Sequence, residues 1–508
     1  MKGILKKLLN LNLLKENPEK FIFSAILLLS LILLFANLSN QYLWEDEAQT
    51  ALISKTILTG GVPLGYDGKN YFSQEGGAEY GKNYLWKWHM WLPFYVLAGF
   101  YKIFGITTFV SRLPFVIFGF GTIVLIYFFA RSLWPDKNIS LIASGLLCVT
   151  VPFLLLSRQC RYYSMSMFFA ILALIAYVLM LDRKKYSAVL LFLSSTLLFH
   201  TQHFFVVPLF AAIFLNALIF KRNILKILII VIIAVAILNV PWLIWMMGTQ
   251  FKIKAMSFSL FFDSARTFLH DIFKYIVPKW IGLVLLLIVA IRRITAGRFL
   301  GFDKSFYMNL SLPVFFIIFN IITMSILADV AFIRYLSPSI PLLILLVAFV
   351  INSAAGVHRW IRILSVILFL MSGQMGDYLW EITHDYDGPC EGISRYLNEH
   401  GSPDDVVAIT YGDMVLKFYT KMRIVGGFTG EPMEPAKDAR WVIIRKYTLH
   451  RFDSQVKKYI LNNIDLSKYF ATTIDYPDTP WENRESPGAH LFETRTWEDR
   501  VVIYEKIK

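Results

Sequence analysis

The chain has 508 residues, of which 56% are hydrophobic and only 17% charged, and its net charge is +14. Soluble globular domains carry about 25% charged residues, so this composition excludes an ordinary soluble protein. Much of the positive charge lies in short loops between apolar runs, where it sets membrane orientation, and no nucleic-acid-binding pattern accompanies it. The three cysteines are too few and too scattered for a disulfide framework or a zinc-binding spacing.

The first three quarters of the chain contain apolar segments that we predict to be transmembrane helices, since about 20 apolar residues cross the hydrocarbon core. There are about eleven, at 21–38, 112–131, 139–156, 163–181, 186–200, 203–220, 224–246, 276–291, 306–327, 337–353 and 361–376. No small-residue cleavage site follows the first segment, so we interpret it as an uncleaved membrane helix. Residues 1–376 are therefore predicted to form an all-α polytopic membrane domain.

The connections between these segments fall into two alternating sets. One set is short and basic, with lysines and arginines within 2–20, 131–137, 183–185, 221–226, 292–304 and 359–362. The positive-inside rule places this set in the cytoplasm. The other set is longer and more polar, at 39–111, 157–162, 200–203, 247–275 and 328–336. We predict that it lies outside together with the tail, in a bacterial inner membrane or its archaeal equivalent.

The tail, residues 377–508, reads as a small soluble α/β domain on the periplasmic or extracytoplasmic side. Short β-branched runs at 406–409, 441–444 and 501–504 predict strands, and 392–399 and 455–461 predict helices. The stretch 476–488 predicts a loop. The tail has no glycine-rich phosphate-binding motif and no nucleophile elbow. We expect an acceptor-binding or stabilising module rather than the catalytic centre.

Three adjacent carboxylates, Glu45, Asp46 and Glu47, follow the first membrane helix. Carboxylates beside a membrane are costly unless they are solvated or used. They are candidates for catalysis. The alternative is a solvated loop, or the acidic first turn of a helix whose dipole favours negative charge.

Three arginines, Arg158, Arg161 and Arg334, fall in outer connections, where the positive-inside rule disfavours them. A lipid phosphate at membrane depth would explain them, because the planar guanidinium binds phosphate oxygens through two parallel hydrogen bonds. Lys87 and His89 of the first outer loop are further candidates for this phosphate site.

Pairing of these arginines with Asp46, Glu47 or Asp329 is the alternative, and it does not exclude phosphate binding. A carboxylate that faces a phosphate held by cations is typical of group transfer. An aspartate could deprotonate an acceptor hydroxyl, and the cations could stabilise the charge on a departing phosphate. Transfer of a sugar from a polyprenyl-phosphate carrier fits this pattern and requires no nucleotide-binding fold. The main alternative is a secondary transporter of an anionic or lipid-linked substrate, although no internal repeat is visible.

The same residues resemble motifs of the C-type membrane glycosyltransferases (GT-C), in the branch that includes protein O-mannosyltransferases and lipid A aminoarabinose transferases. The resemblance covers most of 20–345 and lies in the segments Asp46-Glu47, His89-Met90-Trp91-Leu92, Phe104-Gly105, Ser111 to Pro114, Ser157 to Tyr163, and Arg334-Tyr335-Leu336 with Pro338 and Pro341. The branch tends to have a lysine or histidine followed by Pro-Pro-Leu. The prolines are missing after His89, and Lys87 is a nearby substitute.

The resemblance implies a GT-C fold with two amphipathic helices in the first outer loop, a lipid-linked donor and an inverting single displacement. It implies that Asp46 is the base, and we expect Glu47 to assist it. Acceptors in reach of such a site include a glycan, a lipid or a protein. The sequence identifies no cofactor with certainty, but some relatives bind a divalent metal ion, for which Glu47, His89 and His203 could supply ligands here.

Aromatic and imidazole side chains in the outer connections are candidates for substrate contacts: Tyr162, Tyr163, Tyr335 and His203. For His203 the alternative is a polar cap at the end of a membrane helix. The tryptophans at 86, 88 and 91 are explained most simply as an interfacial aromatic belt, with stacking on a sugar as the alternative.

Overall fold

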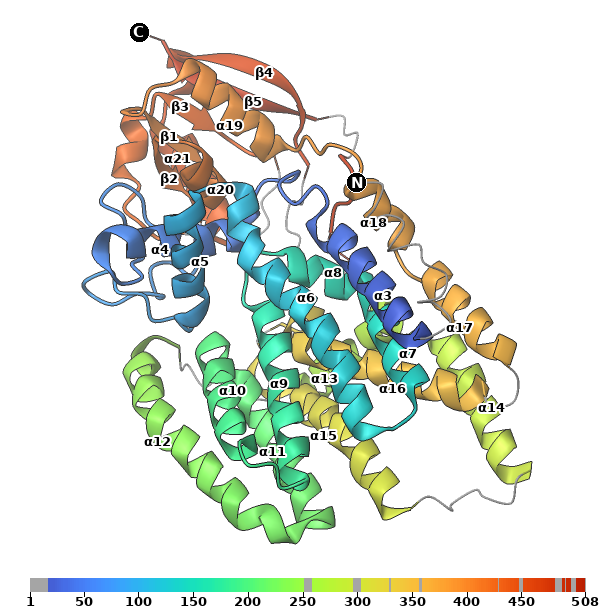
Figure 1. Cartoon of the computed structure of the whole chain (residues 1–508). Helices are drawn as coiled ribbons and strands as arrows, with labels where there is room; N and C mark the ends of the chain where they lie inside the picture. The colour runs from blue at the N-terminus through green and yellow to red at the C-terminus, as the bar shows by residue number, and fades with distance from the viewer. Residues whose placement is uncertain are drawn as a thin grey trace, which may run out of the picture.

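The computed structural model describes residues 17–250, 258–295, 303–328, 330–355, 359–427, 429–446, 451–479, 487–488, 490–494 and 499–507. A bundle of helices forms one end of the molecule and a small sheet domain the other, with the helices α4 (Glu45–Gly60) and α5 (Leu92–Phe104) between them (Figure 1). The predicted combination of a polytopic helical domain and a C-terminal α/β domain is therefore confirmed.

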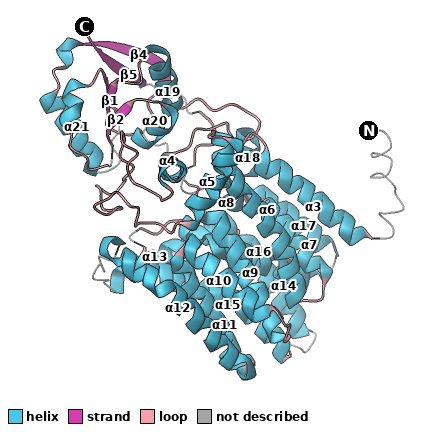
Figure 2. Cartoon of the chain, turned by 60° about the vertical axis from the view of Figure 1, so that its left-hand side comes forward, coloured by secondary structure: helices cyan, strands magenta, loops and turns pink. Residues whose placement is uncertain are grey.

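The bundle contains helices that differ widely in length. They are α3 (Pro18–Phe35), α6 (Thr108–Leu133), α7 (Lys137–Cys148), α8 (Val151–Arg158), α9 (Tyr163–Leu181), α10 (Ser187–Thr201), α11 (Val206–Phe220), α12 (Leu225–Gln250), α13 (Phe258–Asp271), α14 (Lys279–Thr295), α15 (Lys304–Leu327), α16 (Ile340–Ala355), α17 (Arg359–Ser372) and α18 (Met375–Glu381). Short 3₁₀ or π helices join or extend them: η1 (His203–Phe205), η2 (Arg222–Ile224), η3 (Ile272–Ile276) and η4 (Ile333–Ser339). Figure 2 shows how completely helices dominate this part of the molecule.

In the part of the chain that the structure describes, seven helices are long and apolar enough to cross a membrane, or up to ten if each bent pair is one span. All eleven predicted segments coincide with helices, but the fifth, α10, has only 15 residues. The third and eleventh are bent, by 60° between α7 and α8 and by 58° between α17 and α18. Pro152 at the start of α8 and Gly373 between α17 and α18 lie at these breaks, and neither residue favours a continuous helix.

Two boundaries differ from those that apolarity predicted. The connection 247–275, expected to be an outer loop, contains α13 and η3, which meet α14 at an angle of 89°. The last membrane segment continues into α18 as far as Glu381, beyond the expected boundary at 376. The helices α13 and α18 contain polar as well as apolar residues, so a prediction from consecutive apolar residues does not include them.

The first outer loop contains the two expected helices, and most of α4 is buried inside the protein. Ten of its 16 residues are buried. Its acidic first turn complements the helix dipole, and Glu47 Oε2 accepts a hydrogen bond from the Trp44 N–H at the helix start (3.4 Å). At its other end Gly61 adopts a positive φ of 71°, which closes the helix without a Cβ clash. These two ends fix the length and direction of α4.

The C-terminal domain is a five-stranded sheet in the order β2-β1-β3-β5-β4. Its strands are β1 (Val406–Ile409), β2 (Arg423–Gly426), β3 (Trp441–Ile443), β4 (Tyr469–Pro477) and β5 (Arg500–Lys506), and its helices are α19 (Pro389–His400), α20 (Asp413–Tyr419) and α21 (Arg451–Asn463), with single turns η5 (Glu434–Asp438) and η6 (Leu466–Lys468). The pairs β2-β1 and β1-β3 are parallel, whereas β5 pairs antiparallel with both β3 and β4. The three predicted strands and two predicted helices are present. The strands β2 and β4 and the helix α20 were not predicted.

The sheet domain rests directly on the first outer loop. The side-chain amide of Asn70 donates to the Met422 carbonyl (3.1 Å) and accepts from the Ile424 N–H (2.8 Å), so it covers the open edge of β2 as a neighbouring strand would. Tyr419, at the end of α20, stacks on Tyr42 with ring centroids 3.7 Å apart. The C-terminal domain thereby holds the segment that leads into α4.

Candidate functional site

A cavity of about 490 Å³ lies at the end of the bundle next to the sheet domain, where α4 meets the helix ends. Its polar lining comes from α4, the first outer loop, the turn before α9, and η4: Asp46, Gln49, Gln74, Glu75, Glu79, His89, Arg161, Tyr162, Tyr163, Gln202, Arg334 and Tyr335. Seven of the eleven site residues predicted from sequence meet here. They come from connections far apart in the chain, which the fold brings to one place.

Asp46 lies between two arginines in this cavity. Its Oδ2 is 3.3 Å from a terminal nitrogen of Arg161 and 3.2 Å from one of Arg334. Neither ion pair uses Oδ1. Asp46 belongs to the first turn of α4, where the positive end of the helix dipole adds to the two guanidinium charges. The arrangement leaves one oxygen of the carboxylate outside both ion pairs.

Arg161 is fixed from several sides by the N-terminal half of α4 and the first outer loop. One terminal nitrogen donates to the Asp46 carbonyl (3.1 Å) and to Thr50 Oγ1 (3.0 Å). The other lies 3.4 Å from His89 Nε2. Because residues 46 and 50 are one helical turn apart on the same face, α4 presents both of these groups to Arg161.

His89 is held as a neutral imidazole. A guanidinium has donors only, so His89 Nε2 accepts from Arg161 and the proton is assigned to Nδ1. Burial, with the positive charges of Arg161 and Arg334, lowers the pKa of His89 well below its usual value. Its buried Nδ1 has no hydrogen-bond partner among the described residues. His89 can therefore donate one hydrogen bond to a bound anion or hydroxyl.

A second carboxylate, Glu79, was not predicted and lines the same cavity. Gln49 Nε2 donates to its Oε1 (2.9 Å), while the Gln74 and Glu75 N–H groups donate to its Oε2 (2.7 and 3.0 Å). Ser73 Oγ also donates to Oε2. Burial outweighs these hydrogen bonds and raises the pKa of Glu79 to about 7. In the sequence, Glu79 is an isolated glutamate in a polar loop, so no local pattern distinguishes it.

Glu47 and Arg158 lie outside this cavity, although both were predicted site residues. Both Glu47 oxygens accept from Arg112, at 2.9 and 2.7 Å, and the Cys160 N–H also donates to it (2.7 Å). Arg158 donates to the carbonyls at the C-terminal end of α3, including those of Leu33 and Leu34. These side chains line a separate cavity of about 20 Å³ and join α3, α4, α6 and α8.

Lys87 and His203 also do not line the large cavity. The ammonium group of Lys87 lies 4.7 Å from the Trp245 ring, in a cation–π contact. His203 is buried beside Phe204, with ring centroids 3.9 Å apart, and neither of its ring nitrogens has a hydrogen-bond partner in the described parts of the chain. Asp329, the alternative partner of Arg334, is outside the described residues.

Apolar side chains line the remaining surface of the cavity. They come from the first outer loop, η1, the end of α15 and the segment that follows it: Trp88, Phe204, Phe205, Met324, Leu327, Ala328, Val330 and Phe332. The cavity therefore suits a ligand with an anionic head, which the arginines can bind, and a hydrocarbon tail, which the apolar lining can contact.

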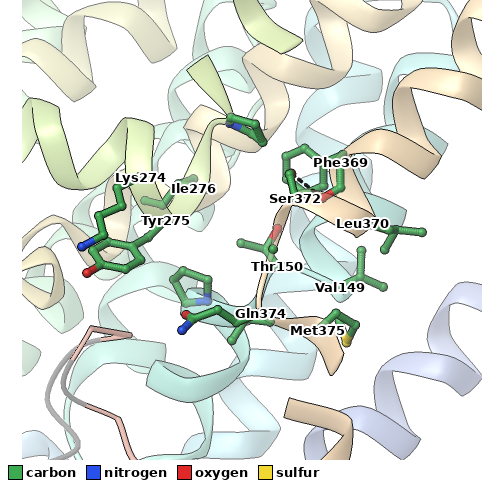
Figure 3. Close-up of a pocket in the computed structure, with 14 residues that line it drawn as sticks. Val149, Thr150, Lys274, Tyr275, Ile276, Phe369, Leu370, Ser372, Gln374 and Met375 are labelled. Atoms are coloured by element: carbon green, nitrogen blue, oxygen red, sulfur yellow. Dashed lines mark hydrogen bonds between the residues drawn. The ribbon is translucent and has the colours of Figure 1, made fainter. Parts of the chain in front are cut away.

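A further cavity, of about 60 Å³, lies where three helix breaks meet, and Figure 3 shows its lining. Val149 and Thr150 come from the α7–α8 break, Pro278 from the η3–α14 break, and Gln374 from the α17–α18 break. Lys274 is its one charged lining residue, and no carboxylate lines it. The acid–base groups that group transfer requires lie in the larger cavity.

The ligands suggested for a divalent metal do not form a binding group. Glu47 is occupied by Arg112, and His89 faces Arg161. Across the part of the chain that the structure describes, no three His, Cys, Asp or Glu side chains are grouped so that they could hold a metal ion. The charges that could balance a phosphate here are those of Arg161 and Arg334.

The bundle, the two-helix first outer loop and the carboxylate–arginine cavity next to the sheet domain give the chain the fold of the C-type membrane glycosyltransferases. The sequence profile of the dolichyl-phosphate-mannose-protein mannosyltransferase family matches residues 89–245. The crystal structure of ArnT from Cupriavidus metallidurans bound to undecaprenyl phosphate superposes with a TM-score of 0.59 at 13% identity, covering 96% of this chain and 98% of that one.

A second similar structure is the oligosaccharyltransferase AglB from the archaeon Archaeoglobus fulgidus, in complex with an inhibitory peptide and a dolichol-phosphate. It gives a TM-score of 0.50 at 12% identity and covers 85% of this chain and 70% of that one. No curated protein matches the chain by sequence. The chain is thus a multi-pass membrane protein with the fold of ArnT over almost its whole length.

Proposed function

We propose that the protein transfers a sugar from a polyprenyl-phosphate donor to an acceptor hydroxyl at the outer face of the membrane. The observation that carries the proposal is the position of Asp46, in a cavity lined on one part by two arginines and on another by apolar side chains. The similarity to ArnT, whose structure contains undecaprenyl phosphate, supports the class of donor.

The donor phosphate would bind at Arg161 and Arg334, with the Nδ1–H of His89 as a third donor. Guanidinium groups bind phosphate oxygens bidentately, so an incoming phosphate competes with Asp46 for them. Tyr162, Tyr163 and Tyr335, which line the same cavity, are candidates for further contacts. The polyprenyl chain would lie against the apolar lining from η1 and α15. Arg158 and Lys87 are not part of this proposed site.

Catalysis would use Asp46 as the general base. Its carboxylate takes the proton of the acceptor hydroxyl while the acceptor oxygen forms a bond to the anomeric carbon of the sugar. The bond between that carbon and the phosphate oxygen breaks, and polyprenyl phosphate leaves with the negative charge that Arg161 and Arg334 stabilise. A single displacement of this kind inverts the configuration at the anomeric carbon.

The acceptor would approach from the side of the C-terminal domain, which covers the first outer loop (Figure 1). A glycan, a lipid or a protein hydroxyl would satisfy the chemistry. The charge pattern of the loops supports a cell inner membrane with this domain on its periplasmic or extracytoplasmic side.

The experiment that tests the proposal compares wild type with Asp46→Asn. Purified protein is supplied with radiolabelled polyprenyl-phosphate sugars and a membrane extract as acceptor source. Asparagine keeps the shape but cannot take the proton, so we expect a loss of transfer of about 10²- to 10⁴-fold. The matched control is Asp404→Asn, an exposed aspartate of the C-terminal domain, which should transfer at the wild-type rate.

Each outcome separates the class from the base. If Asp46→Asn has unchanged thermal stability and transfers the sugar at the wild-type rate, the protein is a glycosyltransferase but Asp46 is not its general base. If wild type neither transfers any sugar nor binds a polyprenyl phosphate, the class itself is wrong. Repeating the assay with EDTA checks metal dependence, and from the donor set present we expect no loss.

A further inference from the structure

One wall of the large cavity plays no part in the proposed phosphate site. It consists of Gln49 on α4 and of Gln74, Glu75 and Glu79 in the loop that follows residue 72. Amides and carboxylates are hydrogen-bonding partners for hydroxyl groups, neither has affinity for hydrocarbon, and the negative charge of the carboxylates disfavours a phosphate. Asp46 and Gln49 are three residues apart on α4, so this wall begins one helical turn from the proposed base.

The loop that carries this wall is held rigidly by its own hydrogen bonds. Glu79 Oε2 accepts from two successive backbone N–H groups, those of Gln74 and Glu75. Ser73 Oγ accepts from the N–H groups of Glu75 (3.1 Å) and Gly77 (2.6 Å). Gln49 Nε2 ties the loop back to α4 by donating both to Glu79 and to the Phe72 carbonyl. The backbone of Gln74 is therefore fixed against the cavity before any ligand binds.

Gln74 supplies a hydrogen-bond donor that the protein leaves unused. Its side chain lines the cavity, and its Nε2 is buried without a partner among the residues that the structure describes. Buried donors in native proteins nearly always have a partner, so one that lines a cavity is available to a ligand. Glu75, beside it, is exposed and also lines the cavity.

We infer that this wall recognises the transferred sugar, with Gln74 donating to a sugar hydroxyl, and that it selects a neutral or positively charged sugar over one that carries a carboxylate. This inference rests on the proposed function. A sugar attached to a phosphate at Arg161 and Arg334 would lie next to Asp46 and therefore next to Gln49. The exposed carboxylate of Glu75 would attract an amino group and repel a uronic acid. Glu79 acts as a positioning residue, because it holds the Gln74 backbone and not the ligand.

The test measures equilibrium binding to the full-length protein in detergent with five probes. They are polyprenyl monophosphate, which has no sugar, and the polyprenyl-phosphate derivatives of mannose, glucose, 4-amino-4-deoxyarabinose and glucuronic acid. We expect wild type to bind at least one of the neutral or amino-sugar donors more tightly than both the monophosphate and the glucuronic acid donor.

Gln74→Met keeps the length of the side chain and removes its donor. This variant should bind the preferred sugar donor about 3- to 10-fold more weakly than wild type, as expected for the loss of one hydrogen bond. Its affinity for the monophosphate should not change. Glu75→Gln should strengthen binding of the glucuronic acid donor about two- to fivefold, since the carboxylate is exposed and screened. The matched control is Gln455→Met, at an exposed glutamine of α21, which should change none of the five affinities.

The outcomes distinguish this inference from the proposed function. Sugar recognition by this wall is ruled out, and the phosphate site is retained, in either of two cases. Wild type binds the monophosphate at least as tightly as every sugar donor, or Gln74→Met lowers the affinities for the monophosphate and for the preferred sugar donor equally. If wild type binds none of the five lipids, the proposed function is wrong as well. Equal affinity of wild type for the glucuronic acid and the preferred donor would overturn the charge selectivity alone.

Discussion

At the scale of single residues, Asp46 and Glu47 are neighbours in sequence that have unrelated surroundings. Successive residues of a helix point about 100° apart, so α4 directs Asp46 to the large cavity and Glu47 toward Arg112. Glu47 is fully buried, and both its oxygens are paired with a guanidinium. Removing one partner of such a buried pair typically costs about 3–5 kcal/mol, so we assign Glu47 to the stability of the helix junction and not to proton transfer.

The same division separates Arg158 from Arg161. Arg158 donates to backbone carbonyls at the end of α3, which would otherwise be left without intrahelical partners. Arg161, three residues later, faces the cavity because the turn at 159–162 reverses the chain between α8 and α9. An outer arginine that the positive-inside rule disfavours therefore has two physical explanations in this protein.

Glu79 predicts a pH dependence of stability. Its pKa is raised to about 7 by burial, whereas an unfolded glutamate titrates near 4.5. Between these values the folded protein retains a proton that the unfolded chain has lost, so stability falls as pH rises through this window. Glu79→Gln removes the titration. We expect the thermal unfolding midpoint of wild type to fall more than that of the variant between pH 5 and pH 8.

The size of this effect follows from the same linkage. The difference between wild type and variant should amount to about 3 kcal/mol at most across the window. Glu399→Gln, at an exposed position of α19, is the control and should follow wild type. Parallel curves for wild type and Glu79→Gln would show that the carboxylate stays ionised in the folded protein.

At the scale of elements, the edge of β2 depends on a side chain from the membrane domain. Asn70 replaces a missing neighbour strand by accepting from Ile424 and donating to Met422. We expect Asn70→Ala to leave both groups unsatisfied, which costs about 1–3 kcal/mol each when buried. Hydrogen exchange of the segment 422–426 should become faster, and the C-terminal domain should become easier to cleave from the membrane domain.

A control for this prediction is Asn463→Ala, since the amide of Asn463 bonds only within α21 and is exposed. It should leave exchange at 422–426 unchanged. Unaltered exchange in Asn70→Ala would mean that the edge of β2 is protected by other contacts of the loop, such as those of Lys69 with the carbonyls of Pro403 and Lys421.

At the scale of the whole molecule, the sheet domain and the connections between α6 and α7, α9 and α10, and α11 and α12 lie at opposite ends of the bundle (Figure 1). The native cysteines, Cys148, Cys160 and Cys390, are buried, so an added cysteine reports on its own side of the membrane. In intact cells, a membrane-impermeant thiol reagent should label Glu399→Cys on α19 but not Lys184→Cys in the α9–α10 connection. Labelling of Lys184→Cys instead would reverse the orientation.

The sequence by itself determined the polytopic helical architecture and the α/β character of the tail, and it predicted the class of chemistry that we propose. Hydrocarbon requires long apolar helices, and basic residues mark the connections between them, so both features are written locally in the chain. The arginines of the outer connections predicted a phosphate site, and the acidic segment at 45–47 predicted a base, because both patterns are also local in the sequence. The short edge strand β2 was not predicted, because a side chain distant in sequence, that of Asn70, satisfies its open edge.

Only the tertiary structure decided which charged residues share one cavity. Asp46, Arg161 and Arg334 belong to segments that sequence spacing cannot bring together, and their contact depends on how α4 packs against the ends of α9 and η4. The same packing keeps Glu47 and Arg158 out of the large cavity, because Glu47 pairs with Arg112 and Arg158 donates to carbonyls at the end of α3. It also gave Glu79 and Gln74 a place in the site, since burial and an unused donor are properties of the folded chain and have no counterpart in residue type or spacing.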